Sequence, residues 1–192
     1  VIYFSPEDLD LVRGEPTQRR DFLDKLLITR TPRLAGVISD YDRVVRQRNT
    51  LLKTRAPESS LAPWTEQLIS LGAQLTAERI SLVEKLNPYV GAHYAKLNEV
   101  KAASIAYKSP TDGLTTDVEN NITILNAKQI EVARNEIERG VSLIGPHRDD
   151  LHLHLGDFPA KGYASHGESW SMAITLRIGS FTLLRDEGSS PI

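Results

Sequence analysis

The sequence lacks several features from which a function is often inferred. Its 192 residues include no cysteine, which excludes a disulfide scaffold and thiolate metal sites. No apolar run approaches the roughly 20 residues that a membrane-spanning helix needs, and the first residues lack the pattern of a signal peptide. We therefore expect a soluble globular protein in the cytoplasm.

Several patterns that carry chemistry are also missing. The P-loop pattern Gly-x-x-x-x-Gly-Lys-Ser/Thr does not occur, and no strand pattern ends in the acidic pair of a Walker B segment, so this chain alone lacks the parts that hold and activate ATP. There is no Gly-x-Ser-x-Gly elbow and no acid that would orient His166 beside Ser165, which disfavours a Ser-His-Asp hydrolase. The spacing of His147, His152, His154 and His166 fits no zinc site, so we predict no metal site.

Charge is unevenly placed along the chain. The net charge is −2, but residues 1–55 carry eleven Lys and Arg against eight Asp and Glu. Such a segment can form a basic surface that binds the phosphates of a polyanion. A solvated helix face with its own salt bridges is the commoner explanation, and it stays open on these residues alone.

The apolar pattern of the first half is mainly helical. Residues 1–4 are β-branched or aromatic and predict a strand, which a short helix to about residue 12 and a second over 16–28 should follow. Apolar heptads predict two long helices, one over 32–55 and one from about residue 63, folded back as an antiparallel hairpin. Arg48 and Arg79 interrupt these heptads.

The second half mixes helices and strands. Helices are predicted over 87–99, 127–139 and 168–185, the second of them stopped by Gly140, and strands are predicted over 103–107 and 151–155. Alternation in the strand 151–155 places three leucines on one face and two histidines on the other. The predicted fold class is therefore α/β in the mixed α+β sense.

The turn Ser165-His166-Gly167-Glu168 runs directly into a helical pattern. Backbone N–H groups and the positive end of the helix dipole meet at such a junction, the Ser hydroxyl adds a donor, and Gly allows close approach, so the turn can hold a phosphate. Ser followed three residues later by Glu is also a capping box, and on these residues alone this is the commoner explanation. We expect Trp170 to occupy a core position under the helix.

A second dense motif is Gly145-Pro146-His147-Arg148-Asp149-Asp150. It combines a rigid turn, an imidazole, a permanent cation and two carboxylates. Arg148 can pair with a phosphate or with a neighbouring carboxylate. The alternative is a tight turn in which Arg148 and an Asp neutralise each other.

Five motifs, taken in order, resemble the RecF family of bacterial DNA replication and repair proteins. They are Phe4-Ser5-Pro6-Glu7-Asp8-Leu9, Gly14-x-Pro16-x-x-Arg19-Arg20-x-Phe22-Leu23-Asp24, Tyr41-x-x-Val44-x-x-Gln47-Arg48-Asn49-x-Leu51-Leu52-Lys53, Gly145-Pro146-His147-Arg148-Asp149-Asp150 and Ala164-Ser165-x-Gly167-Glu168. The resemblance covers almost the whole chain. It implies a partial ABC-type ATPase head, related to the SMC proteins, that carries an inserted antiparallel helical arm. It also implies a central fragment, with the P-loop before Val1 and the Walker B strand starting at Pro191-Ile192.

The resemblance assigns roles to particular residues. It implies that Ser165, Gly167 and Glu168 form the signature motif, which faces the γ-phosphate of ATP held by the opposite subunit, and that Glu7 and Asp8 belong to a nucleotide-sensing loop. His147 and Arg148 are possible contacts to phosphate or to the other head. The DNA-contact candidates, taken from the basic third of the chain, are Arg19, Arg20, Arg43, Arg46 and Arg48.

The function implied is ATP-dependent DNA binding in recombinational repair and replication, with ATP-driven dimerisation of the heads and a weak DNA-dependent ATPase in the full-length dimer. Expected cofactors are ATP and Mg; expected partners are single-stranded DNA or junctions with double strands, a second copy, and recombination mediator proteins. The expected domains are head segment 1–31, helical arm 32–100 and head segment 101–192. The alternative is a non-catalytic helical module that recruits a protein partner, in which the Ser165 turn is only a cap.

Overall fold

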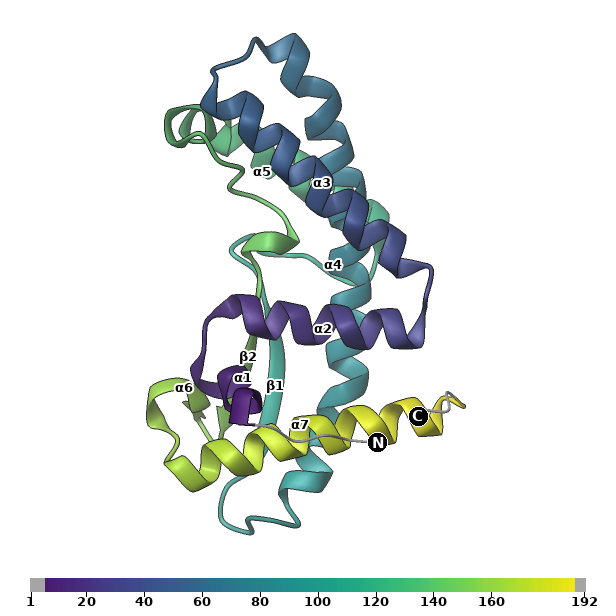
Figure 1. Cartoon of the computed structure of the whole chain (residues 1–192), viewed down its shortest axis with the longest axis vertical. Coiled ribbons are helices and arrows are strands. Elements are labelled where there is room, and N and C mark those ends of the chain that lie inside the picture. The colour runs from purple at the N-terminus through teal and green to yellow at the C-terminus, as the bar shows by residue number, and fades with distance from the viewer. Residues whose placement is uncertain (1–5, 189–192) are drawn as a thin grey trace. The chain divides into compact units, whose positions relative to one another are not determined.

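The computed structural model describes residues 6–188 (Figure 1). The predicted strand at 1–4 and the predicted strand start at 191–192 lie outside the described residues. The chain divides into two compact units. The described residues of the first unit are 6–30, 81–108 and 150–188, and those of the second are 31–80 and 109–149. The predicted boundaries of head and arm remain a prediction.

The first unit contains a small antiparallel sheet. Its strands are β1 (Ala103–Lys108), β2 (Asp150–Leu155) and β3 (Phe158–Pro159), in the order β1-β2-β3, with Ile105 opposite Leu153. The two predicted strands are confirmed. The β2 leucines are buried, whereas His152 and His154 lie on the opposite face with their rings 6.1 Å apart, as the alternation predicts.

Helices surround this sheet within the first unit. They are η1 (Pro6–Leu9), α1 (Asp10–Arg13), α2 (Pro16–Arg30), α6 (Ala160–Tyr163) and α7 (His166–Asp186). In Figure 1, α1 lies beside α6 and α7, and α2 contacts β2. The predicted core of α2 is confirmed, since Phe22, Leu23, Leu26 and Leu27 are buried, and α7 buries Met172, Leu176 and Leu184.

Helix α4 (Glu58–Tyr94) differs from the prediction of two separate helices. It begins before Pro63 and continues through Asn87-Pro88, where a break was expected. The apolar stripe explains this, because Leu82, Leu86, Val90 and Tyr94 recur every four residues and all are buried. Burial of a continuous apolar face outweighs the local cost of proline.

The second unit is built from α3 (Leu34–Lys53), the part of α4 up to residue 80, and α5 (Val118–Arg139). Helix α5 begins nine residues before the predicted start, because the Asp117 side chain accepts hydrogen bonds from the Glu119 and Asn120 amides at 2.9 and 3.3 Å. Its predicted end is confirmed: Gly140 follows in the left-handed conformation, with φ +66°.

The two arginines that interrupt the heptads are buried in this second unit. Arg48 is 2% exposed and donates to Glu136, Ser142 and Thr65. Arg79 is 3% exposed, and its Nη1 donates to the Pro146 carbonyl at 2.8 Å. Each charge replaces an apolar seam residue because a specific acceptor faces it.

Candidate nucleotide-phosphate site

The beginning of α7 forms a complete capping box in the first unit. Ser165 is the N-cap, with extended backbone at φ −60° and ψ 170°. Its Oγ accepts from the Glu168 amide at 3.2 Å, and the Ser165 amide donates to Glu168 Oε2 at 2.8 Å. The capping-box interpretation is therefore confirmed, and the geometry fixes the direction in which the turn faces.

Glu168 places a carboxylate close to any anion that would bind at this turn, and the protein neutralises it. Lys101 Nζ, from the segment after α4, lies 2.5 Å from Glu168 Oε1. The hydrogen bond from Lys101, and after it those from Ser165, lower the pKa of Glu168 to about 2. The same contact raises the pKa of Lys101. The carboxylate is thus paired with a cation, which reduces its repulsion of a phosphate.

The turn keeps donors available after the cap has formed. Among the described residues, no protein acceptor is recorded for the amides of His166 and Gly167, which occupy the first turn of α7. The Ser165 hydroxyl uses its oxygen as the acceptor, so its proton remains available to a ligand. Ser165 and Gly167 are exposed, and a Cβ added at Gly167 would have no atom within 4 Å. This donor set fits one phosphate group.

His166 and Trp170 form a contact on the same turn. The Trp170 indole N–H donates to His166 Nε2 at 2.8 Å, so in the neutral ring the proton lies on Nδ1. The rings meet edge to face with centroids 6.1 Å apart. Trp170 is therefore not the fully buried core residue that the apolar pattern predicts.

Ser169 and Arg13 stabilise the turn through hydrogen bonds. The buried Ser169 hydroxyl donates to the Ser165 carbonyl at 2.8 Å and accepts from Arg13 Nε at 3.1 Å. This chain of bonds ties α1 to the N-cap and adds a positive group near it. Neither Lys101 nor Arg13 belongs to a recognisable sequence motif, so only the three-dimensional structure identifies them.

The predicted nucleotide-sensing residues lie at the start of the described chain. Asp8 is 4% exposed and its Oδ1 accepts from Arg177 Nε of α7 at 2.9 Å. The Arg177 guanidinium also lies 5.7 Å from the centre of the Phe22 ring. Asp8 therefore joins η1 to α7. Glu7 precedes it in η1, so the two residues of the predicted sensing loop and helix α7, where the signature motif is predicted, belong to the same unit.

The Gly145 motif forms a tight loop whose first part belongs to the second unit. Gly145 has φ +104°, and a Cβ there would lie 2.4 Å from Tyr41 Oη. Tyr41 Oη is 2.7 Å from His147 Nδ1, and His147 Nε2 is 3.2 Å from the Ser142 carbonyl oxygen. These contacts hold His147 as a positioning group of the loop, with glycine required at its start.

Arg148 is exposed and donates through Nε and Nη2 to the Ser142 carbonyl, at 2.9 and 2.6 Å. Asp150, which could have paired with it, instead binds Arg19 in the first unit. Arg148 thus uses one edge of its guanidinium to hold the loop while the side chain stays at the surface.

The five DNA-contact candidates differ in exposure. Arg43 and Arg46 are exposed on α3, with Arg43 2.9 Å from Asp40, and Arg20 is half-buried on α2, 3.1 Å from Thr17 Oγ1. Arg19 and Arg48 are instead 5% and 2% exposed and bound by carboxylates. The charges of these two arginines are therefore neutralised inside the protein, and their side chains are not accessible to a polyanion in this structure.

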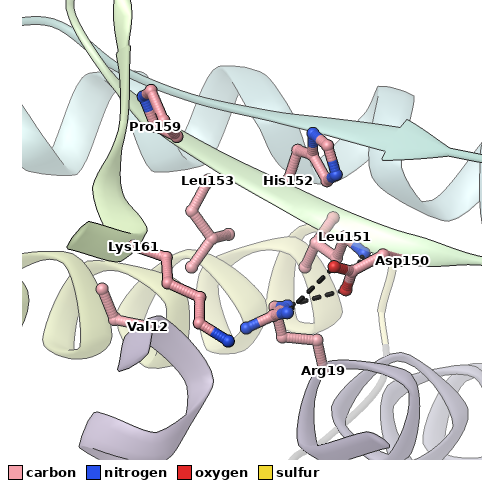
Figure 2. Close-up of a pocket in the computed structure, with 8 residues that line it drawn as sticks. All are labelled: Val12, Arg19, Asp150, Leu151, His152, Leu153, Pro159 and Lys161. Atoms are coloured by element: carbon pink, nitrogen blue, oxygen red, sulfur yellow. Dashed lines mark hydrogen bonds and ion pairs between the residues drawn. The ribbon is translucent and has the colours of Figure 1, made fainter. Parts of the chain in front are cut away.

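A small cavity of about 110 Å³ lies in the first unit beside β2 (Figure 2). Its charged groups are satisfied by the protein. Arg19 binds Asp150 through two bonds of 2.7 and 2.9 Å, and Lys161 donates to the Gly14 carbonyl at 3.0 Å. The charged side chains that line the cavity therefore hold α2, β2 and α6 in place, and we assign no ligand to the cavity. Groups of three or more His, Asp or Glu side chains suited to a metal are not found in residues 6–188.

Comparisons with known proteins agree on one family. The chain is 46% identical, over 98% of its length, to the DNA replication and repair protein RecF of Beutenbergia cavernae, and 46% identical, over its whole length, to that of Streptomyces avermitilis. It covers 55% and 54% of these proteins, so it spans about half the length of the curated relatives it matches. No family model matches the chain.

Solved structures show the fold. A structure described as the recombination mediator protein RecF-ATPrS in the RecFOR pathway matches 98% of the chain with a TM-score of 0.91 at 22% identity. The corresponding RecF-ATP structure matches the same share with a TM-score of 0.90. In both cases the chain covers 52% of the solved chain.

The mixed helical fold with its small sheet is thus that of a partial ABC-type ATPase head, and the predicted fold class is confirmed. Within this class, the chain is similar over almost its whole length to about half of RecF, the DNA replication and repair protein, as the five motifs indicated. The alternative of an unrelated interaction module is not favoured. The part of the chain that the structure describes contains no helix that could cross a membrane.

Proposed function

We propose that this chain is the central part of an ATP-dependent DNA-binding protein of recombinational repair and replication. The capped turn at Ser165 carries the proposal, because it presents unused donors beside a neutralised carboxylate. Its homology to RecF proteins supports the same function. The P-loop belongs, in this proposal, to a segment of the full-length protein outside the chain.

The signature turn acts on a nucleotide held by a second copy. Ser165, through its hydroxyl, and the His166 and Gly167 amides bind oxygens of the γ-phosphate, aided by the positive end of the α7 dipole. The γ-phosphate then bridges two copies, so ATP favours the dimer and its hydrolysis removes that preference. Magnesium bound together with the nucleotide would neutralise phosphate charge. Glu7 and Asp8 form the sensing loop near this nucleotide.

DNA binding in this proposal depends on phosphate contacts and is independent of sequence. Arg43 and Arg46 are three residues apart on α3 and both are exposed, so they lie on neighbouring parts of one helix face. Arg20 adds a cation in the first unit, and Arg148 remains available to phosphate or to the other head. Recombination mediator proteins, and DNA with single strands or junctions, are the proposed partners.

The first experiment tests the signature assignment in the full-length protein. Ser165→Arg places a long cation where the phosphate approaches and removes the N-cap oxygen. We expect loss of ATP-dependent retention on DNA, with ATP binding to the monomer maintained. The control is Ser59→Arg, at an exposed position on α4 in the second unit, which should retain wild-type behaviour. Unchanged retention by Ser165→Arg would refute the signature assignment.

The second experiment tests the DNA surface. Each phosphate contact contributes about 0.9 to the slope of log affinity against log salt for duplex DNA. Arg43→Gln/Arg46→Gln should weaken binding to all sequences alike and reduce the slope by about 1.8. Arg134→Gln is the control, since Arg134 is 91% exposed on α5 of the same unit. Equal slopes for the double variant and this control would exclude Arg43 and Arg46 from the surface.

A further inference from the structure

Two exposed aromatic side chains precede the signature turn. Phe158 of β3 is 59% exposed and Tyr163 of α6 is 68% exposed, although both are large apolar groups. Their rings are stacked, with centroids 5.5 Å apart and planes inclined by 25°. We name this pair the aromatic anchor. An exposed apolar surface of this kind marks an interaction site more often than a random position does.

The aromatic anchor is held in place by the backbone beneath it. Phe158 pairs with Leu155 across the β2–β3 turn, and Gly162 redirects the chain with φ +88°. Between the two rings in sequence, Lys161 Nζ donates to the Gly14 carbonyl at 3.0 Å and lies 3.2 Å from Glu15 Oε1. The ring pair is thus preorganised, which lowers the entropic cost of docking.

The aromatic anchor is close to the donors that await a phosphate. Tyr163 is two residues before Ser165. Lys101 binds Glu168 of the same turn, and its neighbour in sequence, Val100, is 90% exposed. Two segments of the first unit that adjoin the signature turn, one by sequence and one through the Lys101 contact, therefore carry exposed apolar side chains. A second copy that brings a phosphate to Ser165 must also approach these segments.

We propose that the aromatic anchor packs against the second copy of this protein when ATP joins the two heads. This inference rests on the proposed function, because it takes its partner from the composite site. Aromatic side chains bury about 150–250 Å² each, so at the observed exposure the pair offers roughly 200–300 Å². That is about a third of the roughly 800 Å² which one partner contributes to a standard interface. Aromatic residues in such positions carry much of the binding energy.

The test measures ATPγS-dependent dimerisation of the full-length protein by sedimentation velocity. Phe158→Ser/Tyr163→Ser should raise the dimer dissociation constant at least about thirty-fold, which corresponds to about 2 kcal/mol. Binding of ATPγS to the monomer and the midpoint of thermal unfolding should stay close to wild type. Tyr163→Phe keeps the ring and should retain the affinity. Ile130→Ser is the matched control, because Ile130 is 81% exposed on α5 of the second unit.

The outcomes separate this inference from the proposed function. If Ser165→Arg abolishes dimerisation and the double serine variant stays within about threefold of wild type, the aromatic anchor is overturned while the composite site stands. If Ser165→Arg also leaves dimerisation unchanged, the proposed function itself fails. A loss of dimer affinity in Tyr163→Phe as large as that in the double variant would likewise overturn apolar packing of the aromatic anchor as the cause of the effect.

Discussion

Replacing Arg48 by Met should strongly destabilise the second unit. Arg48 Nη2 lies 2.6 Å from Glu136 Oε2, and Glu136 is fully buried. Glu136 also accepts from Gln129 Nε2 at 2.7 Å and from the Leu143 amide at 2.6 Å. Arg48→Met leaves this carboxylate buried without its counter-charge. Breaking a buried ion pair from one side costs about 3–5 kcal/mol.

A double variant separates the charge from the packing. Glu136→Gln keeps an oxygen for the Leu143 amide and removes the charge, so Arg48→Met/Glu136→Gln buries no unpaired ion. We expect its cost to be at least about 2 kcal/mol smaller than the sum of the two single variants. Arg134→Met is the control, because Arg134 and Glu138 form an exposed pair and their loss should cost less than about 0.5 kcal/mol.

Hydrogen exchange measured by mass spectrometry is the appropriate assay, because it reports the opening free energies of α3 and α5 separately from the first unit. In Arg48→Met, the opening free energies of the amides in both helices should fall by the full 3–5 kcal/mol, so these amides exchange faster. If the second unit unfolds, they should exchange at the rate of an unprotected amide. A cost below about 1 kcal/mol, or additive single variants, would refute the role given to this pair.

Two further predictions concern the loop and the capped turn. Gly145→Ala should destabilise the second unit by about 2–4 kcal/mol in the same exchange assay, because its backbone conformation suits glycine alone and a Cβ would displace Tyr41 from His147. Gly113→Ala, also at positive φ but facing only the tip of Ile124, should cost about 1–2 kcal/mol, and an equal cost at both positions would contradict the Tyr41 contact. Since the pKa of Glu168 is lowered to about 2, its stabilisation of α7 is fully present above pH 4.5 and is lost as the pH falls towards 2. Carbon-13 NMR should show Glu168 titrating near pH 2, and Lys101→Met should raise that midpoint towards 4.5; an unmoved midpoint would rule out Lys101 as the main cause.

The sequence predicts those parts of the site that depend on neighbouring residues. Ser165 and Glu168 are three residues apart, so their reciprocal bonds follow from helix geometry and the capping box is confirmed. The strand β2 follows in the same way from its alternation of Leu and His. The N-cap of α5 could also have been predicted, because Asp117 directly precedes the helix. It was missed, since the prediction started this helix at residue 127.

Contacts between distant residues could not be predicted in this way. Arg48 and Glu136 are 88 positions apart, so nothing in the heptad showed that the interrupting charge is neutralised in the interior. Lys101 and Glu168 are 67 positions apart, and the cation that pairs with the Glu168 carboxylate was missed. The continuity of α4 through Pro88 likewise depends on burial supplied by other segments. Local sequence patterns identify helix caps and strand faces, whereas tertiary packing determines which distant residues contact each other.

The proposal that Ser165 completes a site shared between two copies can be tested by mixing two defective forms of the full-length protein. One carries Ser165→Arg and keeps the P-loop proposed outside this chain; the other carries a substitution in that P-loop and keeps Ser165. Neither should dimerise with ATPγS alone, but the mixture restores one complete site between unlike copies. We predict that affinity-tagged Ser165→Arg protein captures the P-loop variant only when ATPγS is present. Capture no greater than that of either variant alone, under conditions in which the wild-type protein dimerises, would contradict a signature that acts on the partner's nucleotide.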